Sequence, residues 1–256
     1  MAHLRATLLD RLERTDEAFR AFSAANALME ELPTDPVSRA AELRSKLEGE
    51  TTQLTPQWRA SWTESEPPTD GRSDPCFLVG FPRSGTTLLD TFLMGHPDAR
   101  VMEEQPPLNI VEEELGELAA LPELDAEQIA TARARYFEEA SKLVDLRQGA
   151  LLVDKSPLFL YRLPLIQRLF PKAKIILALR HPCDVVLSCF MSNFRLNTAM
   201  SNFLRIEDAA AFYDLCFRHW QTSRVLFNAD VHPVVYEELI KDRERVLRPL
   251  IEWLGL

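Results

Sequence analysis

The sequence predicts an α/β fold with a central, mostly parallel sheet and helices on both of its faces. Short continuous apolar runs, typical of strands buried on both sides, recur from residue 76 onward. Longer segments with helical periodicity separate these runs. The first 50 residues are helical in pattern, so a short all-α segment precedes the sheet.

Length and composition limit the class of protein. The chain has 256 residues, of which 46% are hydrophobic and 27% charged, which is typical of a globular protein with a large core. Lys and Arg total 29 and Asp and Glu total 39, so the formal net charge is −10. Nucleic acid is therefore excluded as a general partner, because phosphate neutralisation needs a basic face. A small anion needs only a local cluster of donors.

Targeting and redox features predict a cytoplasmic protein. No run of about 18 apolar residues is present, so we expect no membrane span. The N-terminus is charged and lacks the apolar core of a secretory signal. The four cysteines show neither a CxxC pair nor a regular framework, which argues against a disulfide scaffold and a zinc site.

The first 50 residues contain a helical pair with apolar and small residues at helical spacing. Ala18, Phe22 and Ala25 occupy positions typical of a single tetratricopeptide repeat. One repeat cannot bury its own apolar face, so we expect the pair to pack on the rest of the chain or to belong to a longer array. It is also a candidate surface for a protein partner. Residues 51–74 are polar and proline-bearing, which predicts a linker.

Beyond this linker, strands and helices alternate, so one α/β domain is predicted over 75–256. In such sheets ligands bind at the carboxyl ends of the strands. The predicted strands are 76–81, 99–104, 151–154, 174–180 and 232–237. The predicted helices are 84–95, 106–118, 124–147, 158–170, 182–193, 206–229 and 238–254.

The strongest local motif lies between the first predicted strand and its helix and reads GFPRSGTT, residues 80–87. In this position backbone N–H groups and a helix N-terminus converge on an anion. The spacing is that of the phosphate-binding loop GxxxxGK[ST], but Thr86 replaces the lysine and Arg83 supplies the positive charge. The missing lysine disfavours hydrolysis of a nucleoside triphosphate, and the arginine suits an anion bound without a metal. The alternative is a tight turn with no ligand.

Four motifs follow one another along the chain: FPRSGTTLL, GHPDARVMEEQ, DKSP and RHPCDVVLS. In this order and with these gaps, residues 75–256 resemble the sulfotransferases that use 3′-phosphoadenosine 5′-phosphosulfate (PAPS). The tyrosylprotein sulfotransferases and the bacterial sulfotransferases with tetratricopeptide repeats are the most similar branches. The resemblance implies a three-layer P-loop fold related to nucleotide kinases. It also implies transfer of a sulfuryl group from PAPS to an acceptor hydroxyl, without a metal.

The resemblance assigns roles to phosphate-binding residues. Arg180 and Ser188 match the pair that binds the 3′-phosphate, and they lie at the end of a predicted strand and about two turns into the next helix. Taken alone, Arg180 is equally compatible with a surface ion pair. The residues that match the loop for the 5′-phosphosulfate are Arg83, Ser84, Gly85, Thr86 and Thr87.

The resemblance also assigns three catalytic groups, Glu104, Lys155 and Arg83. A carboxylate can accept the proton that the acceptor hydroxyl loses, and Glu104 matches the family's general base for direct in-line transfer. Glu103 precedes it, and because adjacent strand residues point to opposite faces, we expect only one of the two at the site. Lys155 would stabilise charge on the transferring or leaving group. For the two glutamates and the lysine, the alternative is a solvated surface side chain.

Other residues near these motifs are predicted to be structural. His96 lies at the end of a helix and is expected to cap or pack rather than to act as a base. Cys183 and Cys189 are expected to be small core residues. Tyr236, after the last predicted strand, has no assigned chemistry.

The chain ends at Leu256, where the resembled family usually has a further segment over the nucleotide. We therefore expect a domain that is incomplete at its C-terminus, with weak PAPS binding and slow or absent turnover. Two other functions stay open: a P-loop kinase or NTPase, and a non-catalytic interaction protein with a vestigial nucleotide fold. The residues do not specify the acceptor among phenols, tyrosine and glycans.

Overall fold

The computed structural model describes residues 1–63 and 70–256. The predicted linker, 51–74, includes residues 64–69, which lie outside the described part. Within that part, no helix is both long enough and apolar enough to cross a bilayer. Two compact units are present: the helical unit comprises residues 1–51 and 181–218, and the sheet unit comprises residues 52–180 and 219–256.

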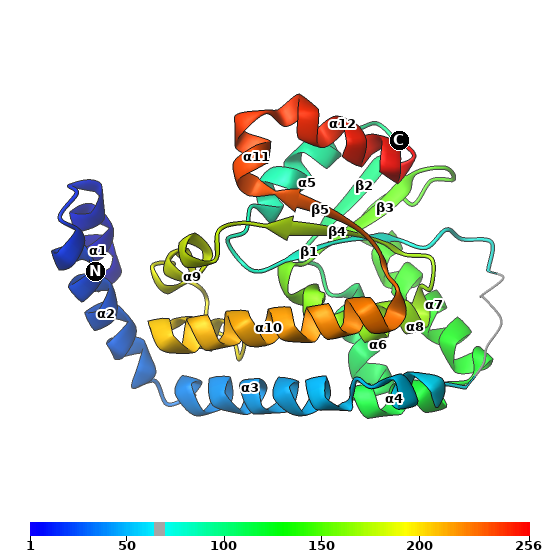
Figure 1. The fold of residues 1–256 in the computed structure, drawn as a ribbon, viewed down its shortest axis with the longest axis horizontal. Coiled ribbons are helices and arrows are strands. Elements are labelled where there is room, and N and C mark those ends of the chain that lie inside the picture. The colour runs from blue at the N-terminus through cyan, green and yellow to red at the C-terminus, as the bar shows by residue number, and fades with distance from the viewer. Residues whose placement is uncertain (64–69) are drawn as a thin grey trace. The chain divides into compact units, whose positions relative to one another are not determined.

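The sheet unit contains a five-stranded sheet in the order β2-β3-β1-β4-β5, and every pairing is parallel (Figure 1). The predicted α/β class is thereby confirmed. The connection after β3 passes to the other side of β1, and such a switch point is where open α/β sheets bind ligands. The strands are β1 (Cys76–Gly80), β2 (Ala99–Glu103), β3 (Leu151–Lys155), β4 (Lys174–Leu179) and β5 (Asp230–Val235).

Side chains alternate along β1 between the two faces of the sheet. On one face, Leu78 belongs to an apolar cluster with Leu89 and Leu250, which lie on two different helices. Burial of each such side chain contributes about 1.5–3 kcal/mol. The helices that cover this face are α5 (Thr86–Met94), α11 (Tyr236–Lys241) and α12 (Arg243–Leu254) (Figure 1).

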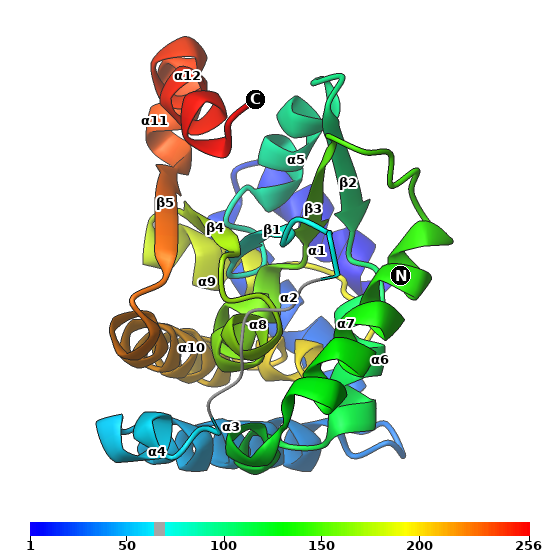
Figure 2. The same cartoon turned by 90° about the vertical axis from the view of Figure 1, so that its right-hand side faces the viewer.

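The opposite face of the sheet is covered by aromatic side chains. Phe77 lies 6.4 Å from Tyr136 and 5.7 Å from Phe170 between ring centroids, and all three rings are fully buried. The helices on this face include α7 (Ala126–Ser141) and α8 (Leu163–Leu169) (Figure 2). The carboxyl ends of the central strands are thus held by two apolar layers.

Two predicted helices are divided in the structure. Segment 238–254 forms parts of α11 and α12, because Asp242 is extended and its side chain accepts the N–H of Arg245 at the start of α12. Segment 158–170 forms a 3₁₀-helix and then α8, and Pro164 lies in the first turn of α8, where no N–H donor is required. The other helices of the sheet unit include α4 (Pro56–Ala60) and α6 (Pro107–Leu115).

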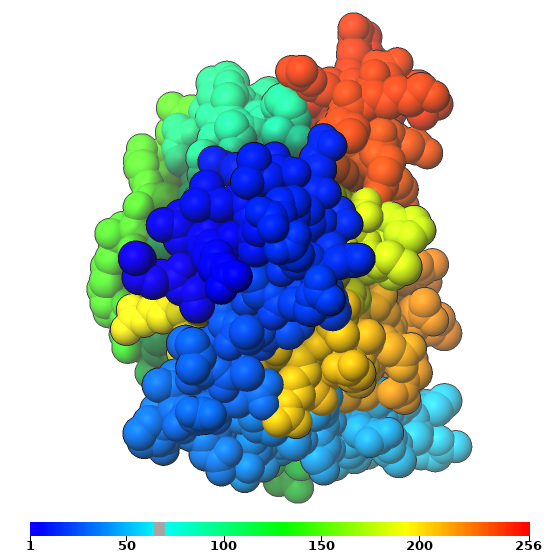
Figure 3. Space-filling view, turned by 90° about the vertical axis from the view of Figure 1, so that its left-hand side faces the viewer, coloured from blue at the N-terminus to red at the C-terminus, as the bar shows by residue number. Residues whose placement is uncertain are grey.

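The helical unit is built on the predicted helical pair, α1 (Ala2–Arg11) and α2 (Thr15–Glu30). Phe22 of α2 shares an apolar cluster with Phe190 of α9. Figure 3 shows the surface of the N-terminal helices, coloured blue. Asn26 Nδ2 also donates a hydrogen bond to the Phe190 carbonyl (3.0 Å). The pair therefore packs on a distant part of the chain, and its likeness to a tetratricopeptide repeat stays a prediction. The remaining helices of this unit include α3 (Pro36–Gln53), α9 (Pro182–Phe190) and the first part of α10 (Ile206–Phe227).

Candidate active site

The loop between β1 and α5 makes a tight turn at the carboxyl end of β1. The Ser84 N–H donates to the Phe81 carbonyl (3.1 Å). Gly85 caps α5 with a φ of 95°, a left-handed conformation that favours glycine. A Cβ at Gly80 would lie 2.7 Å from Ser84 Oγ and 2.8 Å from the Ala178 carbonyl oxygen. Both glycines of the motif are therefore required by the shape of the turn.

This loop has the features of an anion site. Gly85, as the N-cap residue, has no side chain to satisfy the first N–H groups of α5, so these donors point out of the helix end. The Ser84 side chain is 3% exposed, and no described residue offers its Oγ a hydrogen-bond partner. Arg83 is exposed beside it, with a φ of 70° that is uncommon for a residue with a Cβ. A turn without a ligand leaves this buried hydroxyl unexplained, whereas a bound anion uses it.

Arg180 follows β4 and lies against the same loop. Its Nη1 donates to the carbonyl oxygen of Arg83 (3.2 Å), and its guanidinium carbon lies 4.7 Å from the centroid of the Tyr236 ring. A Cβ on Gly85 would approach Tyr236 Cδ2 to 2.5 Å, so the tyrosine also packs on the loop. The structure therefore brings Arg180 to the loop and adds Tyr236, to which the sequence assigned no role.

Lys155, the last residue of β3, is fully buried and surrounded by carboxylates. Its Nζ lies 2.8 Å from Glu103 Oε1, 3.2 Å from Glu104 Oε1 and 3.2 Å from Asp90 Oδ2. Burial alone lowers the pKa of this ammonium, but the three carboxylates outweigh burial and raise the pKa above its usual value. Lys155 is therefore a cation at neutral pH.

Both glutamates at the end of β2 reach Lys155, although only one was expected to face the site. Glu103 lies beside Lys155 in the register of β2 and β3, so its side chain is on the same face. Glu104 would point to the opposite face in a continuing strand, but its φ of 50° ends the strand and turns the carboxylate back to the lysine. Glu104 is 60% exposed and Glu103 is 46% exposed, so Glu104 is the more accessible to a substrate.

Asp90 is a member of this cluster that the sequence analysis missed. It lies in α5, one turn after Thr86, and its side chain is 1% exposed. Burial raises the pKa of the Asp90 carboxyl in spite of the nearby lysine. A signal was present in the sequence, because a single acid interrupts the apolar helix TTLLDTFLM.

The residue before Lys155 points to the other face of the sheet. Asp154 is fully buried, and its Oδ2 accepts a hydrogen bond from the Tyr136 hydroxyl (2.9 Å). Burial raises the pKa of this carboxyl to about 7, although Tyr136 and Arg162 oppose the shift. Its Oδ1 has no partner in the part of the chain that the structure describes.

The other residues assigned to phosphate binding lie on α5 and α9. Thr86 is buried and Thr87 is exposed, both in the first turn of α5. Ser188 is half-buried on α9 and belongs to the helical unit, whereas Arg180 belongs to the sheet unit.

The residues predicted to be structural show one difference from expectation. His96 Nδ1 accepts the N–H of Asp98 (3.2 Å) in the turn after α5. Cys189 is buried as expected, but Cys183 is exposed, so its prediction as a core residue is wrong. The two cysteines are six positions apart on α9, which places them on different sides of the helix.

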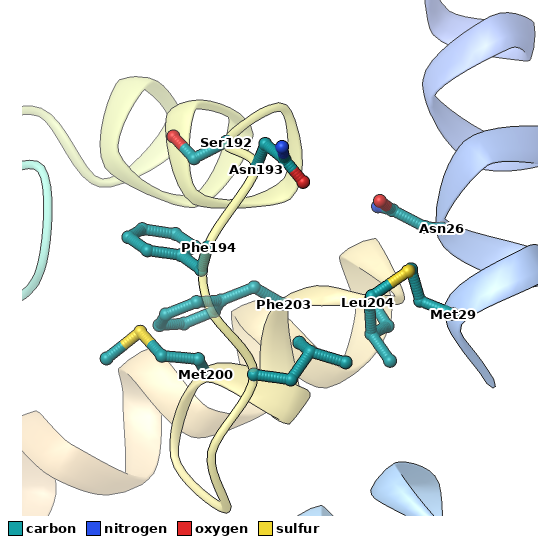
Figure 4. A pocket seen from close by; sticks show the side chains of 9 residues that line it. Asn26, Met29, Ser192, Asn193, Phe194, Met200, Phe203 and Leu204 are labelled. Atoms are coloured by element: carbon teal, nitrogen blue, oxygen red, sulfur yellow. The ribbon is translucent and has the colours of Figure 1, made fainter. Parts of the chain in front are cut away.

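A pocket lies in the helical unit, between α2 and the segment after α9 (Figure 4). Its volume of about 20 Å³ is room for about one water molecule. Phe194, Phe203 and Met29 are among its lining residues, and none of those residues is ionisable. Across residues 1–63 and 70–256, no three His, Cys, Asp or Glu side chains are grouped to hold a metal ion. The candidate active site is therefore the loop with the cluster around Lys155.

Three curated proteins are similar in sequence to this chain. An uncharacterized protein of Aquifex aeolicus (strain VF5) is 26% identical over 266 residues, covering 97% of this chain and 33% of that protein. Nodulation protein NoeE of Sinorhizobium fredii is 32% identical over 127 residues, covering 44% of this chain and 30% of that protein. Protein-tyrosine sulfotransferase 1 of Danio rerio is 25% identical over 194 residues, covering 70% of this chain and 52% of that protein. The matched region thus spans between 30% and 52% of the length of these relatives.

Solved structures and a family model complete the comparison. A sulfotransferase from Alicyclobacillus acidocaldarius is 21% identical with a TM-score of 0.49, covering 72% of this chain and 82% of that chain. The sulfotransferase domain of the Synechococcus PCC 7002 olefin synthase is 24% identical with a TM-score of 0.44, covering 76% of this chain and 78% of that chain. The model of the sulfotransferase family matches residues 75–256, which contain the loop, Glu104, Lys155 and Arg180. This match covers most of the chain, and the protein therefore belongs to the sulfotransferase family of enzymes.

Proposed function

We propose that this chain transfers a sulfuryl group from PAPS to an acceptor hydroxyl by direct in-line transfer. One observation carries the proposal: α5 begins at the loop of residues 80–87, where Ser84 Oγ and the first helical N–H groups are available as donors, and one turn later it contacts the lysine–carboxylate cluster through Asp90. The reaction needs two parts: a binding site for an anionic donor, and a general base with a cation beside it. Family membership supports sulfuryl transfer over the kinase alternative and over a vestigial fold.

The loop residues would hold the 5′-phosphosulfate of PAPS, which supplies an activated sulfuryl group. Ser84 Oγ and the first N–H groups of α5 would donate to it, and Arg83 would add a charge-assisted hydrogen bond. Arg180 and Ser188 are proposed for the 3′-phosphate on the motif RHPCDVVLS. We propose no metal, because the cations Arg83 and Lys155 can balance the developing charge.

Glu104 is the proposed general base. As the acceptor oxygen forms its bond to sulfur, the bond from sulfur to the phosphate oxygen breaks, and the hydroxyl proton moves to Glu104. Negative charge develops on the leaving oxygen, and Lys155 and Arg83 would stabilise it. Lys155 Nζ is already 3.2 Å from Glu104 Oε1, so base and cation are neighbours before a substrate binds.

The acceptor class stays open among a phenol, a tyrosine and a glycan. One relative is a protein-tyrosine sulfotransferase and another is a nodulation protein, and the chain matches each over only part of its length. A protein partner on the α1–α2 pair and a cytoplasmic location are likewise proposals from the sequence.

Transfer of labelled sulfate from PAPS to panels of tyrosine peptides, glycans and phenols tests the function.

Calorimetry with 3′-phosphoadenosine 5′-phosphate, the product nucleotide, tests whether the loop binds the nucleotide. Arg83→Ala should weaken nucleotide binding about 10- to 100-fold, because a hydrogen bond to a charged group is worth about 1.5–3 kcal/mol. Arg248→Ala is the control, since this exposed arginine pairs with Glu244 on α12. Equal nucleotide affinity in Arg83→Ala and the parent would refute the loop assignment, and Mg²⁺-dependent ATP turnover would favour a kinase or NTPase.

A further inference from the structure

Three carboxylates share the Lys155 ammonium, and they differ in their access to water. The side chains of Glu103 and Glu104 are 46% and 60% exposed, whereas that of Asp90 is 1% exposed. Lys155 donates hydrogen bonds to the two glutamates (2.8 and 3.2 Å). Asp90 Oδ2 lies 3.2 Å from the same Nζ as an ion pair. Within this trio, Asp90 is the partner that water does not screen.

The burial of Asp90 is unusual for its surroundings. Its helix neighbours Leu89 and Leu93 belong to the apolar core under α5. A carboxylate buried in such a layer is costly unless it is paired with a cation. Lys155 is the cation paired with it, and Thr91 Oγ1 donates a hydrogen bond to Asp90 Oδ1 (3.4 Å). The position of Asp90 is therefore explained by the lysine.

Asp90 also links Lys155 to the anion-binding loop. It lies four residues after Thr86, about 6 Å along the axis of α5. The N-terminus of this helix is the loop itself, since Gly85 is the N-cap residue. Glu103 and Glu104 come from the end of β2 and provide no such connection. Asp90 therefore connects the ammonium to the proposed donor site through about one turn of α5.

We infer that Asp90 is the positioning residue for Lys155, holding its ammonium toward the loop while Glu104 takes the proton of the acceptor. This inference rests on the proposed sulfuryl transfer. When Glu104 becomes neutral, its attraction for Lys155 weakens. Asp90 Oδ2 accepts no well-aligned hydrogen bond within the described residues, so it has a lone pair for the N–H that Glu104 releases. Without Asp90, the remaining anion would be Glu103, whose attraction is screened by solvent.

Asp90→Asn removes the charge and keeps the size of the side chain. We expect kcat for sulfate transfer to fall about 10- to 100-fold, the effect of a misplaced reacting group. The donor KM should change by less than about threefold, because the lost interaction acts in the transition state. Asp98→Asn is the control and should leave kcat unchanged, since this exposed acid pairs with Arg147 at the surface (3.3 Å).

A second readout needs no turnover. Asp90→Asn should lower the pKa of the Lys155 ammonium, which ¹³C NMR of its Cε carbon can follow, because a buried anion next to it has been removed. Asp90→Glu keeps the charge and should restore this pKa toward that of the parent. An unchanged Lys155 pKa in Asp90→Asn would overturn the inference.

The Lys155→Met background separates positioning from a purely structural role. If Asp90 acts through Lys155, Asp90→Asn should lower kcat no further once Lys155→Met is present. An equal fold-decrease in kcat in the parent and Lys155→Met backgrounds would contradict the inference.

If Asp90→Asn does not fold, Asp90→Glu decides: a lower kcat supports positioning, and an unchanged kcat counts against it. A folded parent without sulfate transfer would refute the proposed function instead, and the Lys155 pKa comparison would still decide the role of Asp90.

Discussion

Asp154 is a buried residue whose protonation links pH to the stability of this fold. Its carboxyl has a pKa of about 7 in the folded protein and an ordinary value of 3.8. As the pH falls below about 7, the folded protein takes up a proton on Asp154 while the unfolded chain does not. The contribution of this group to stability is therefore least above pH 7 and rises as the pH falls toward 4.

Asp154→Asn removes this dependence on pH. Relative to the variant, the parent's free energy of unfolding should increase by up to about 1.4 kcal/mol per pH unit as the pH falls from 7 to 4. Urea unfolding of both proteins at a series of pH values measures this difference, and Asp98→Asn, at an exposed site, is the control. A stability difference that does not change with pH would show that Asp154 does not titrate in this window.

Glu103 and Glu104 share one lysine, but we expect them to differ in function. A general base contributes about 10²- to 10⁴-fold to a rate, so Glu104→Gln should lower kcat by about 100-fold or more. Glu103→Gln keeps the base and should cost less, because its carboxylate only helps to hold Lys155. Single-turnover transfer at saturating donor compares the two. The reverse order of effects would assign the base to Glu103.

At the scale of whole elements, the loop between β1 and α5 depends on the shape of its glycines. Gly85→Ala should weaken nucleotide binding and destabilise the fold by about 1 kcal/mol or more, because φ is 95° and the new Cβ would lie 2.5 Å from the Tyr236 ring. Gly49→Ala in α3 is the matched control, since nothing lies within 4 Å of its Cβ position. This helical substitution should stabilise by about 0.5–1 kcal/mol. Thermal unfolding and calorimetry of both variants test the contrast, and a Gly85→Ala protein as stable and as tight-binding as the parent would contradict it.

The strands and the loop were predictable because their signals are local. Apolar runs mark strands buried on both sides, and β1 is fully buried as such a run requires. The side-chain cluster was less predictable, because it depends on backbone geometry and on tertiary contacts. The φ of 50° at Glu104 has no sequence signature, yet it brings the second glutamate to Lys155. Asp90 meets the lysine across α5 and β3, and Tyr236 meets the loop from the end of β5, and neither contact follows from periodicity.

At the scale of the whole molecule, segments far apart in the sequence form the helical unit. The chain between residues 51 and 181 separates its two parts, so no local pattern marks their association. Arg44 of α3 pairs with Asp208 of α10 (2.9 Å), and Asn26 of α2 bonds to Phe190 of α9 (3.0 Å). These polar contacts join the N-terminal helices to the later segment. The predicted domain boundary at 51–74 stays a prediction.

Phe22 provides a test of this association. Its side chain is 2% exposed in the cluster that contains Phe190, so Phe22→Ala should cost about 3–5 kcal/mol in the stability of the helical unit. Amide hydrogen exchange should then become faster in α9 as well as in α1 and α2, because all three helices lose the same core. Leu28→Ala is the control on the same helix, since Leu28 is 61% exposed and should leave exchange unchanged. Faster exchange confined to α1 and α2 would show that the pair folds as a repeat of its own, independent of α9.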